Sequence, residues 1–266
     1  MASPDAASAG ADPVAPAPPP EAPPSRDGPS PTLGLWTLVL GLALLAGAAA
    51  WLVGESTFDY FKPSLAASES VRGFNPAALN REMPGVRARN GAATFGALGG
   101  LLGLALGLAG GLSRRSAVGA LLGALVGLIF GAAAGALPAL VVMPWQFRHR
   151  SADPSTSSLL MPLLIHLGLW SAAGLAAGLA FGIGSGASKP SRFVQTALGG
   201  LVGAMVGTVV FEVVGAVLFP MAHTPDPFSD TPGTRLLARL CVAGFVGLGV
   251  IRSLPSSSPR NDQAKG

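Results

Sequence analysis

The sequence predicts an all-α integral membrane protein, a multi-pass transmembrane helical bundle of about six spans. Half of its 266 residues are hydrophobic and only 11% are charged, against about a quarter charged in ordinary soluble domains. Glycine also recurs at every fourth position through four long apolar stretches. Each such glycine would cost a helix in water about 1 kcal/mol relative to alanine, whereas small residues in a bilayer let helix backbones pack closely.

The chain begins with a predicted disordered tail. Residues 1–31 hold ten of the 24 prolines together with four acids. This composition cannot bury enough apolar surface to offset the entropy of ordering and favours extended polyproline conformations.

The first predicted span is residues 32–54, an uncharged stretch bracketed by Trp36 and Trp51. Its length suits about 30 Å of hydrocarbon, and tryptophan is typical of the membrane interface. A cleaved signal peptide is the alternative, because small residues surround Ala48. The preceding region is long and acidic rather than short and basic, so we interpret the segment as a signal anchor.

A polar segment, residues 55–90, follows and is predicted to form interfacial helix and loop, since it is too short and too polar for a separate domain. Five further apolar segments come next. They cover about 91–112, 117–143, 159–185, 194–219 and 235–253, and a polar tail, 254–266, ends the chain.

The weak terminal membrane helix, residues 231–253, decides whether there are six spans or five. Only twelve residues separate Arg239 from Arg252, which a helix extends over about 18 Å. The segment spans if Arg239 snorkels or is paired inside the protein. Otherwise it is re-entrant or interfacial.

Two glycine-zipper hairpins, residues 91–144 and 159–220, are predicted to be parallel repeats. Their first helices align at an offset of 75 residues and their second at 76, which also places Pro144 on Pro220. Convergence of low-complexity Gly/Ala/Leu sequence is the alternative. The predicted helix-packing glycines are Gly99, Gly103, Gly107, Gly111, Gly119, Gly123, Gly127, Gly131, Gly135, Gly174, Gly178, Gly182, Gly186, Gly199, Gly203 and Gly207.

A four-residue step advances around a helix by about 40°, so five glycines sweep a wide arc. The pattern predicts either a right-handed crossing or contact with two neighbouring helices. Both arrangements give a tight bundle with little room for a wide pore in one chain.

Three polar residues form a candidate intramembrane cluster: His166, Glu212 and Arg239. Counting residues along each predicted span places all three at a similar depth from the same side of the membrane. One interpretation is a proton or cation relay, or an anchor for a polar substrate, with Glu212 as carrier and His166 titrating near neutral pH. The other, which we favour, is a Glu212–Arg239 ion pair that holds the short last helix, since transport sites usually combine broken helices with several polar groups.

The residue inventory argues against several function classes. Cys241 is the single cysteine, and the three histidines show no metal-ligand spacing with one another or with carboxylates. Phosphate-loop, HExxH and GxSxG motifs do not occur. We therefore expect neither an enzyme nor a bound cofactor, and the net charge of +4, spread over short loops, does not predict nucleic-acid binding.

The expected partner is the lipid bilayer, with a homo-oligomer through the glycine tracks as a possibility. The Arg-, Ala-, Gly- and Pro-rich composition suggests a bacterial inner membrane, and the acid-free basic turns at 113–116 and 188–192 favour a cytoplasmic N-terminus. The predicted role is structural, in assembly or in interaction. The alternative is a small channel or transporter with a proton or cation pathway near Glu212.

Overall fold

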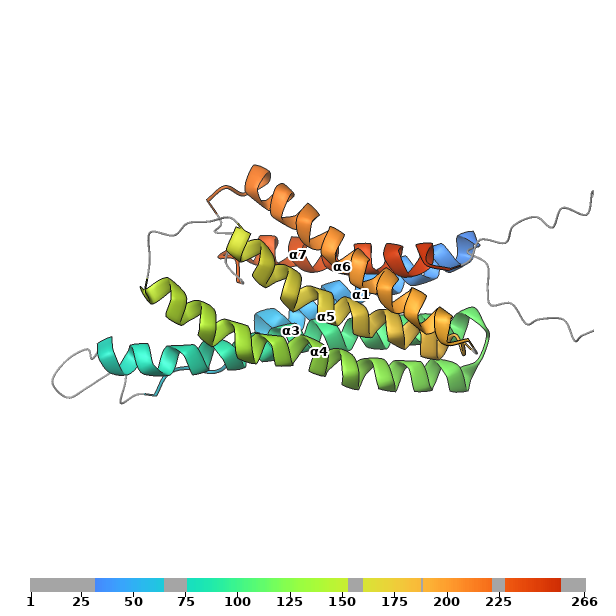
Figure 1. Cartoon of the computed structure of the whole chain (residues 1–266), viewed down its shortest axis with the longest axis horizontal. Coiled ribbons are helices and arrows are strands. Elements are labelled where there is room, and N and C mark those ends of the chain that lie inside the picture. Colours follow the sequence, from blue (N-terminus) through green and yellow to red (C-terminus); the bar gives the residue numbers. More distant parts are fainter. Residues whose placement is uncertain (1–31, 65–75, 153–159, 188, 222–227, 255–266) are drawn as a thin grey trace, which may run out of the picture.

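The computed structural model describes residues 32–64, 76–152, 160–187, 189–221 and 228–254, and within these ranges it is helical, without strands (Figure 1). The predicted disordered tail, 1–31, and most of the polar tail lie outside the described residues. The helices are α1 (Leu33–Thr57), α3 (Pro76–Ser113), α4 (Ala117–Ala152), α5 (Leu160–Gly184), α6 (Pro190–Leu218) and α7 (Pro232–Arg252).

All six helices are long and apolar enough to cross a membrane, with candidate spans of 21 to 37 residues. The all-α multi-pass prediction is therefore confirmed, in its six-span form. The terminal helix α7 runs for 21 residues, or about 32 Å at 1.5 Å per residue. It reaches this length because it includes Arg235 and Arg239, which are both buried inside the protein.

Local sequence explains where several helices begin. The side chain of Thr32 accepts a hydrogen bond from the backbone N–H of Leu35 (3.4 Å), and Thr231 does the same for Thr234 (3.2 Å). Both are N-caps, which satisfy a backbone donor that the first turn leaves unpaired. Pro190 is at the first helical position of α6 and Pro232 at that of α7, where the missing N–H of proline costs nothing.

The connection between the first two helices is shorter than the predicted interfacial segment, 55–90. The first helix continues to Thr57, and α3 already begins at Pro76, so that much of this segment belongs to two transmembrane helices. Helix α4 likewise continues beyond Pro144 to Ala152. The reason is that good helix formers such as Ala, Arg, Glu and Met extend a helix into water after its apolar run has ended.

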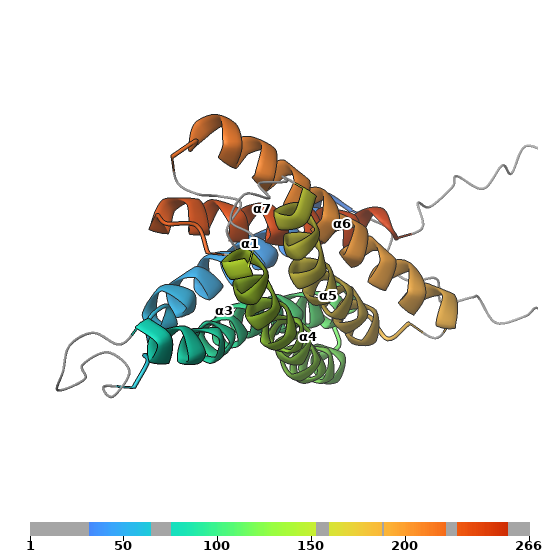
Figure 2. The ribbon, with the colours of Figure 1, turned by 60° about the vertical axis from the view of Figure 1, so that its left-hand side comes forward.

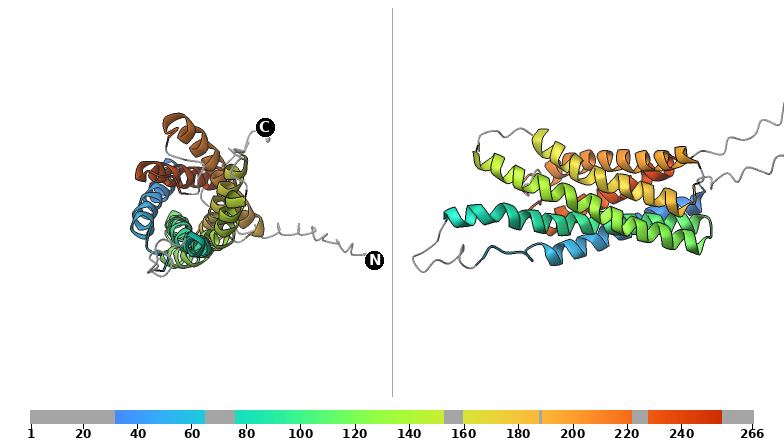
Figure 3. Two further views of the ribbon diagram at one scale, coloured as in Figure 1. Left: turned by 90° about the vertical axis from the view of Figure 1, so that its left-hand side faces the viewer. Right: turned by 60° about the horizontal axis from the view of Figure 1, so that its bottom comes forward.

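The six helices close into a ring. Each packs against the next along the chain, α7 packs against α1, and α5 also contacts α3 across the ring. Figure 2 shows α6 inclined to the other helices, and Figure 3 shows α3 and α4 extending beyond their neighbours at one end. In its most apolar window α3 is 72% buried and α4 only 22%, which makes α3 the central helix and α4 a lipid-facing one.

Helices α3 and α4 meet through their glycines. A Cβ atom on any of these residues would overlap the backbone of the glycine opposite, so only glycine permits this separation of the helices. The facing pairs are Gly99 with Gly131, Gly103 with Gly127, and Gly107 with Gly123.

The glycine track of α4 contacts two neighbours, which was one of the two predicted arrangements. The nearest neighbours of Gly131 and Gly135 are in α3, whereas those of Gly123 and Gly127 are in both α3 and α5, and Gly119 lies against Gly184 of α5. The track therefore drifts around α4 from one partner to the other, as its 40° step requires.

The second hairpin packs differently from the first. In α5, Gly174 faces Gly200 and Gly178 faces Thr196. The α6 glycines that align with the α4 track instead face α7. These α6 contacts are Gly199 with Gly249, Gly203 with Phe245, and Gly207 with Cys241. Glycines that align between the two hairpins thus pack against different neighbours. The internal duplication stays a prediction from the sequence.

The basic turn after α3 contacts the end of α5. The guanidinium of Arg114 donates hydrogen bonds to the carbonyl oxygens of Ser185 (2.7 Å) and Gly186 (2.8 Å). A cation here satisfies free carbonyls and opposes the negative end of the α5 dipole. Gly186, with φ of 58°, has the left-handed conformation that ends the helix.

Candidate functional site

Polar side chains gather inside the bundle, near the end where α3 and α4 protrude. Glu212 lies six residues before the end of α6, and His166 lies six residues after the start of α5. At 1.5 Å per residue, both are about 9 Å inside their helices. Arg239, seven residues into α7, has a similar depth, as its sequence position predicts.

His166 and Glu212 are in direct contact. His166 Nδ1 and Glu212 Oε1 share a short hydrogen bond across α5 and α6. His166 is 1% exposed and stacks on Trp170 with ring centroids 4.7 Å apart and planes 8° from parallel. Phe211 packs edge-on against both rings, so the imidazole is held on its ring face and at its nitrogen.

An ion pair joins helices α1 and α7. Arg235 Nε and Nη2 donate hydrogen bonds of 2.7 and 2.6 Å to the two carboxylate oxygens of Glu55. Its Nη1 donates to the carbonyl oxygen of Ser229 (2.7 Å), and the guanidinium lies 4.2 Å from the ring centroid of Phe58. This two-pronged geometry is the strongest form of a carboxylate–guanidinium contact.

Arg239 lies one helical turn further into the membrane and is less well paired. Its Nη1 is 3.9 Å from Glu55 Oε1, beyond hydrogen-bond distance. The residue is 6% exposed, and Nη1 has no hydrogen-bond partner among the described residues. Gly54 makes room for this side chain, because a Cβ there would overlap the guanidinium.

A small cavity of about 30 Å³ lies between His166 of one pair and Arg235 of the other. Its lining includes His166, Arg235 and Arg239 together with Thr94, whose hydroxyl is buried and unpartnered among the described residues. The other lining residues are Phe95, Leu98, Trp170, Phe211, Phe228, Ser229 and Ala238. This volume suits one water-sized species.

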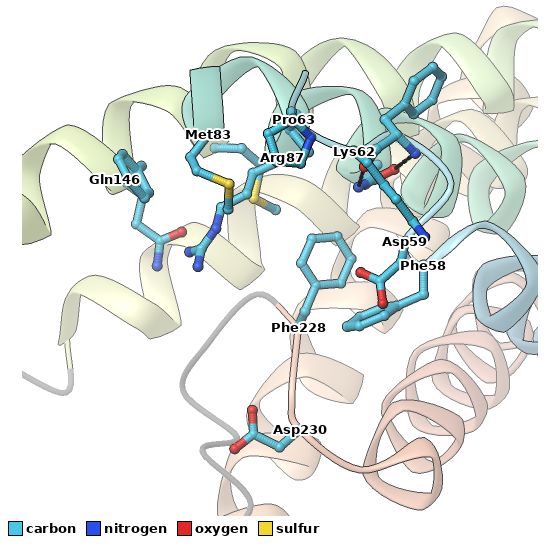
Figure 4. Close-up of a pocket in the computed structure, with 14 residues that line it drawn as sticks. Phe58, Asp59, Lys62, Pro63, Met83, Arg87, Gln146, Phe228 and Asp230 are labelled. Carbon is cyan, nitrogen blue, oxygen red and sulfur yellow. Dashed lines mark hydrogen bonds between the residues drawn. The ribbon is translucent and has the colours of Figure 1, made fainter. Parts of the chain in front are cut away.

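A much larger hollow, about 750 Å³, opens at the protruding end of the bundle; we call it the vestibule. Met83, Arg87 and Gln146 lie on one side of it, and Phe58, Asp59 and Lys62 lie on the other (Figure 4). The rest of the lining is Phe61, Pro63, Val86, Asn90, Met143, Phe147, Phe228 and Asp230.

Side-chain contacts hold the wall of the vestibule in place. The Asn90 side chain accepts a hydrogen bond from the backbone N–H of Phe61 and donates one to its carbonyl oxygen, both 3.0 Å. Ser64 donates to the carboxylate of Glu82 through its N–H and its hydroxyl, both 2.7 Å. Residues 61–64, which follow α1, are thus held against α3.

Phe228 lines both the vestibule and the small cavity. Its ring lies 5.6 Å from Phe58 and 5.6 Å from Phe95, measured between centroids. An aromatic side chain therefore separates the open hollow from the buried polar groups.

The structure brings the predicted cluster together with different partners. Glu212 contacts His166, and the acid nearest Arg239 is Glu55, so the expected Glu212–Arg239 ion pair is replaced by two separate pairs. The physical reason is that α7 packs against α1 at this end. The side chains of His149 and His223 lie outside the described residues. Within the described ones, no three metal-ligating side chains converge.

Sequence reasoning missed Glu55, Arg235 and Thr94. Glu55 was assigned to the connecting segment because the first span was expected to end at residue 54. A signal for it existed in α7, where Arg235 and Arg239 are four residues apart and so share one helix face. Two cations on one face of a membrane helix require an acid from a neighbour.

The fold and the buried ionisable cluster define an integral membrane protein of the polytopic α-helical class. Comparison with models of known protein families, with curated proteins and with solved structures finds no match to this chain.

Proposed function

We propose that this protein is a compact structural, assembly or interaction component of the membrane, without enzymatic activity, and that the vestibule is where it meets its partner. The observation that carries the proposal is the contrast between the two parts of the molecule. The glycine contacts of α3, α4 and α5 bring backbones together, whereas the end opposite the basic turns is hollowed.

The chemistry of the vestibule supports a binding role. Its volume of about 750 Å³ is within the range of sites that hold small molecules or peptide side chains. Aromatic, Met and Arg side chains, which are enriched where proteins bind one another, supply much of its lining. Arg87 is itself positioned by Phe147, with 5.2 Å between the guanidinium carbon and the ring centroid.

We also propose a bacterial inner-membrane location with a cytoplasmic N-terminus, which the composition and the basic turns support. The vestibule then faces the opposite compartment. An oligomer through the glycine tracks stays a prediction, and the contacts described for these tracks lie within one chain.

Photo-crosslinking in native membranes tests the interaction role. A photoreactive amino acid replaces Lys62 or Gln146 in the vestibule, and the control carries it at Ile129, an exposed residue on the lipid-facing side of α4. The proposal expects a discrete protein or ligand adduct from both vestibule positions and only lipid adducts from Ile129. Lipid adducts alone at all three positions would overturn it.

A transport role is the second candidate, because the structure places His166 against Glu212 beside a cavity. The full chain reconstituted in liposomes, with Glu212→Gln as the matched variant, tests it through proton and cation flux. Flux that the variant abolishes would favour transport over our proposal. No flux in the parent, together with a lower melting temperature of the variant, would favour a structural role for the pair.

A further inference from the structure

We propose that the cavity between Arg239, Thr94 and His166 is a binding site for one small monovalent anion, of which chloride is the representative. This inference is independent of the proposed function, since it concerns the buried cluster and not the vestibule. It starts from two residues that line the cavity and that each carry a buried side-chain atom without a hydrogen-bond partner among the described residues.

Arg239 and Thr94 each present an unused donor. Both residues line the cavity, and they are 6% and 2% exposed. Arg239 Nη1 and Thr94 Oγ1 have no hydrogen-bond partner among the described residues. A buried donor without an acceptor destabilises the folded state, and a charged one does so more strongly, so an acceptor in the cavity would stabilise the fold.

The charges around the cavity favour an anion over water. Two cations, Arg235 and Arg239, line the cavity. The acid that contacts both is Glu55, and its two carboxylate oxygens accept hydrogen bonds from Arg235. Arg239 is thus left with a positive charge that no hydrogen-bonded carboxylate offsets among the described residues. A single monovalent anion balances it, which water does not.

Size restricts the ligand further. A cavity of about 30 Å³ admits one water-sized sphere, which suits chloride or bromide and is too small for phosphate, sulfate or a carboxylic acid. The anion would reach the site from the vestibule past Phe228, which lines both spaces. Trp170 lies on the same cavity wall and provides a fluorescent reporter.

Thermal unfolding of the purified full chain in detergent, followed by tryptophan fluorescence, tests the site. Chloride is titrated against gluconate at constant ionic strength, with sulfate as a second comparison. We expect a saturable rise in melting temperature of about 3 °C with chloride, because an anion that binds only the folded state stabilises it. We expect no rise with sulfate.

Three variants identify the residues involved. Thr94→Val removes the hydroxyl at nearly constant shape and should reduce the chloride effect, and Arg239→Gln should abolish it. Arg252→Gln, an exposed arginine on the same helix, is the control and should keep it. If Arg239→Gln does not fold, Thr94→Val alone carries the test.

Two results would overturn the proposal. One is a parent protein whose melting temperature does not respond to chloride, which would mean that water occupies the cavity. The other is a chloride effect of equal size in the parent and in Thr94→Val, which would place the anion elsewhere.

Discussion

Arg235 holds Glu55 through two hydrogen bonds, of 2.7 and 2.6 Å, and so joins the last helix of the bundle to the first. This contact closes the ring of six helices at the end where the polar cluster lies. It also explains how a segment with two arginines is accommodated among membrane helices, because one carboxylate from α1 lies within 4 Å of both.

Replacing Glu55 should therefore loosen the bundle. Glu55→Gln leaves Arg235 and Arg239 without a counter-charge, and we expect a loss of about 2 kcal/mol in the free energy of unfolding. That is below the usual 3–5 kcal/mol for a fully buried pair, because Glu55 is 24% exposed. Thermal unfolding in detergent measures the loss. Asp59→Asn, four residues further along the chain than Glu55, is the control, and equal melting temperatures for both variants would contradict the assignment.

The glycine contacts predict that replacing glycine with alanine changes stability differently at two positions. A methyl group at Gly103 would overlap the backbone of Gly127, whereas nothing lies within 4 Å of a methyl group at Gly41. We expect Gly103→Ala to destabilise the protein by about 3 kcal/mol through overpacking and Gly41→Ala to be neutral or slightly stabilising. Melting temperatures of the two variants provide the comparison, and a neutral Gly103→Ala would contradict the close α3–α4 contact.

The Arg114 contact predicts a link between the α3–α4 turn and the end of α5. Arg114→Gln removes the donors to Ser185 and Gly186, and we expect a cost of about 1 kcal/mol, since this side chain is exposed. Lys189→Gln removes a charge from the neighbouring turn and serves as the control. Chemical unfolding of the two variants distinguishes a specific contact from a general charge effect, which would affect both equally.

The topology predicts opposite sides for two engineered cysteines. In a Cys241→Ala background, Lys62→Cys lies at the vestibule and Arg115→Cys lies at the turn between α3 and α4. With the proposed orientation, a membrane-impermeant maleimide added to intact cells should label the first, and should label the second only after permeabilisation. The reverse pattern would invert the orientation, and labelling of both in intact cells would contradict a membrane crossing by α3, the helix between the two positions.

The sequence was sufficient for the class of fold because lipid imposes strict local requirements. A span needs about 20 apolar residues with its backbone hydrogen bonds satisfied within the helix, and both properties are visible in the chain. The four-residue glycine period likewise indicated close packing. It could not say which helix each glycine faces, and the α6 track illustrates this, since Gly199, Gly203 and Gly207 face α7 rather than α5.

The polar cluster shows the same division. Sequence position alone placed His166, Glu212 and Arg239 at one depth, since depth follows from counting residues at 1.5 Å each. Which groups pair with one another depends on the rotation of each helix and on its neighbours in the ring. These come from packing between segments far apart in the chain, and only the tertiary structure paired Glu212 with His166 and brought Glu55, 180 residues away in sequence, to Arg235.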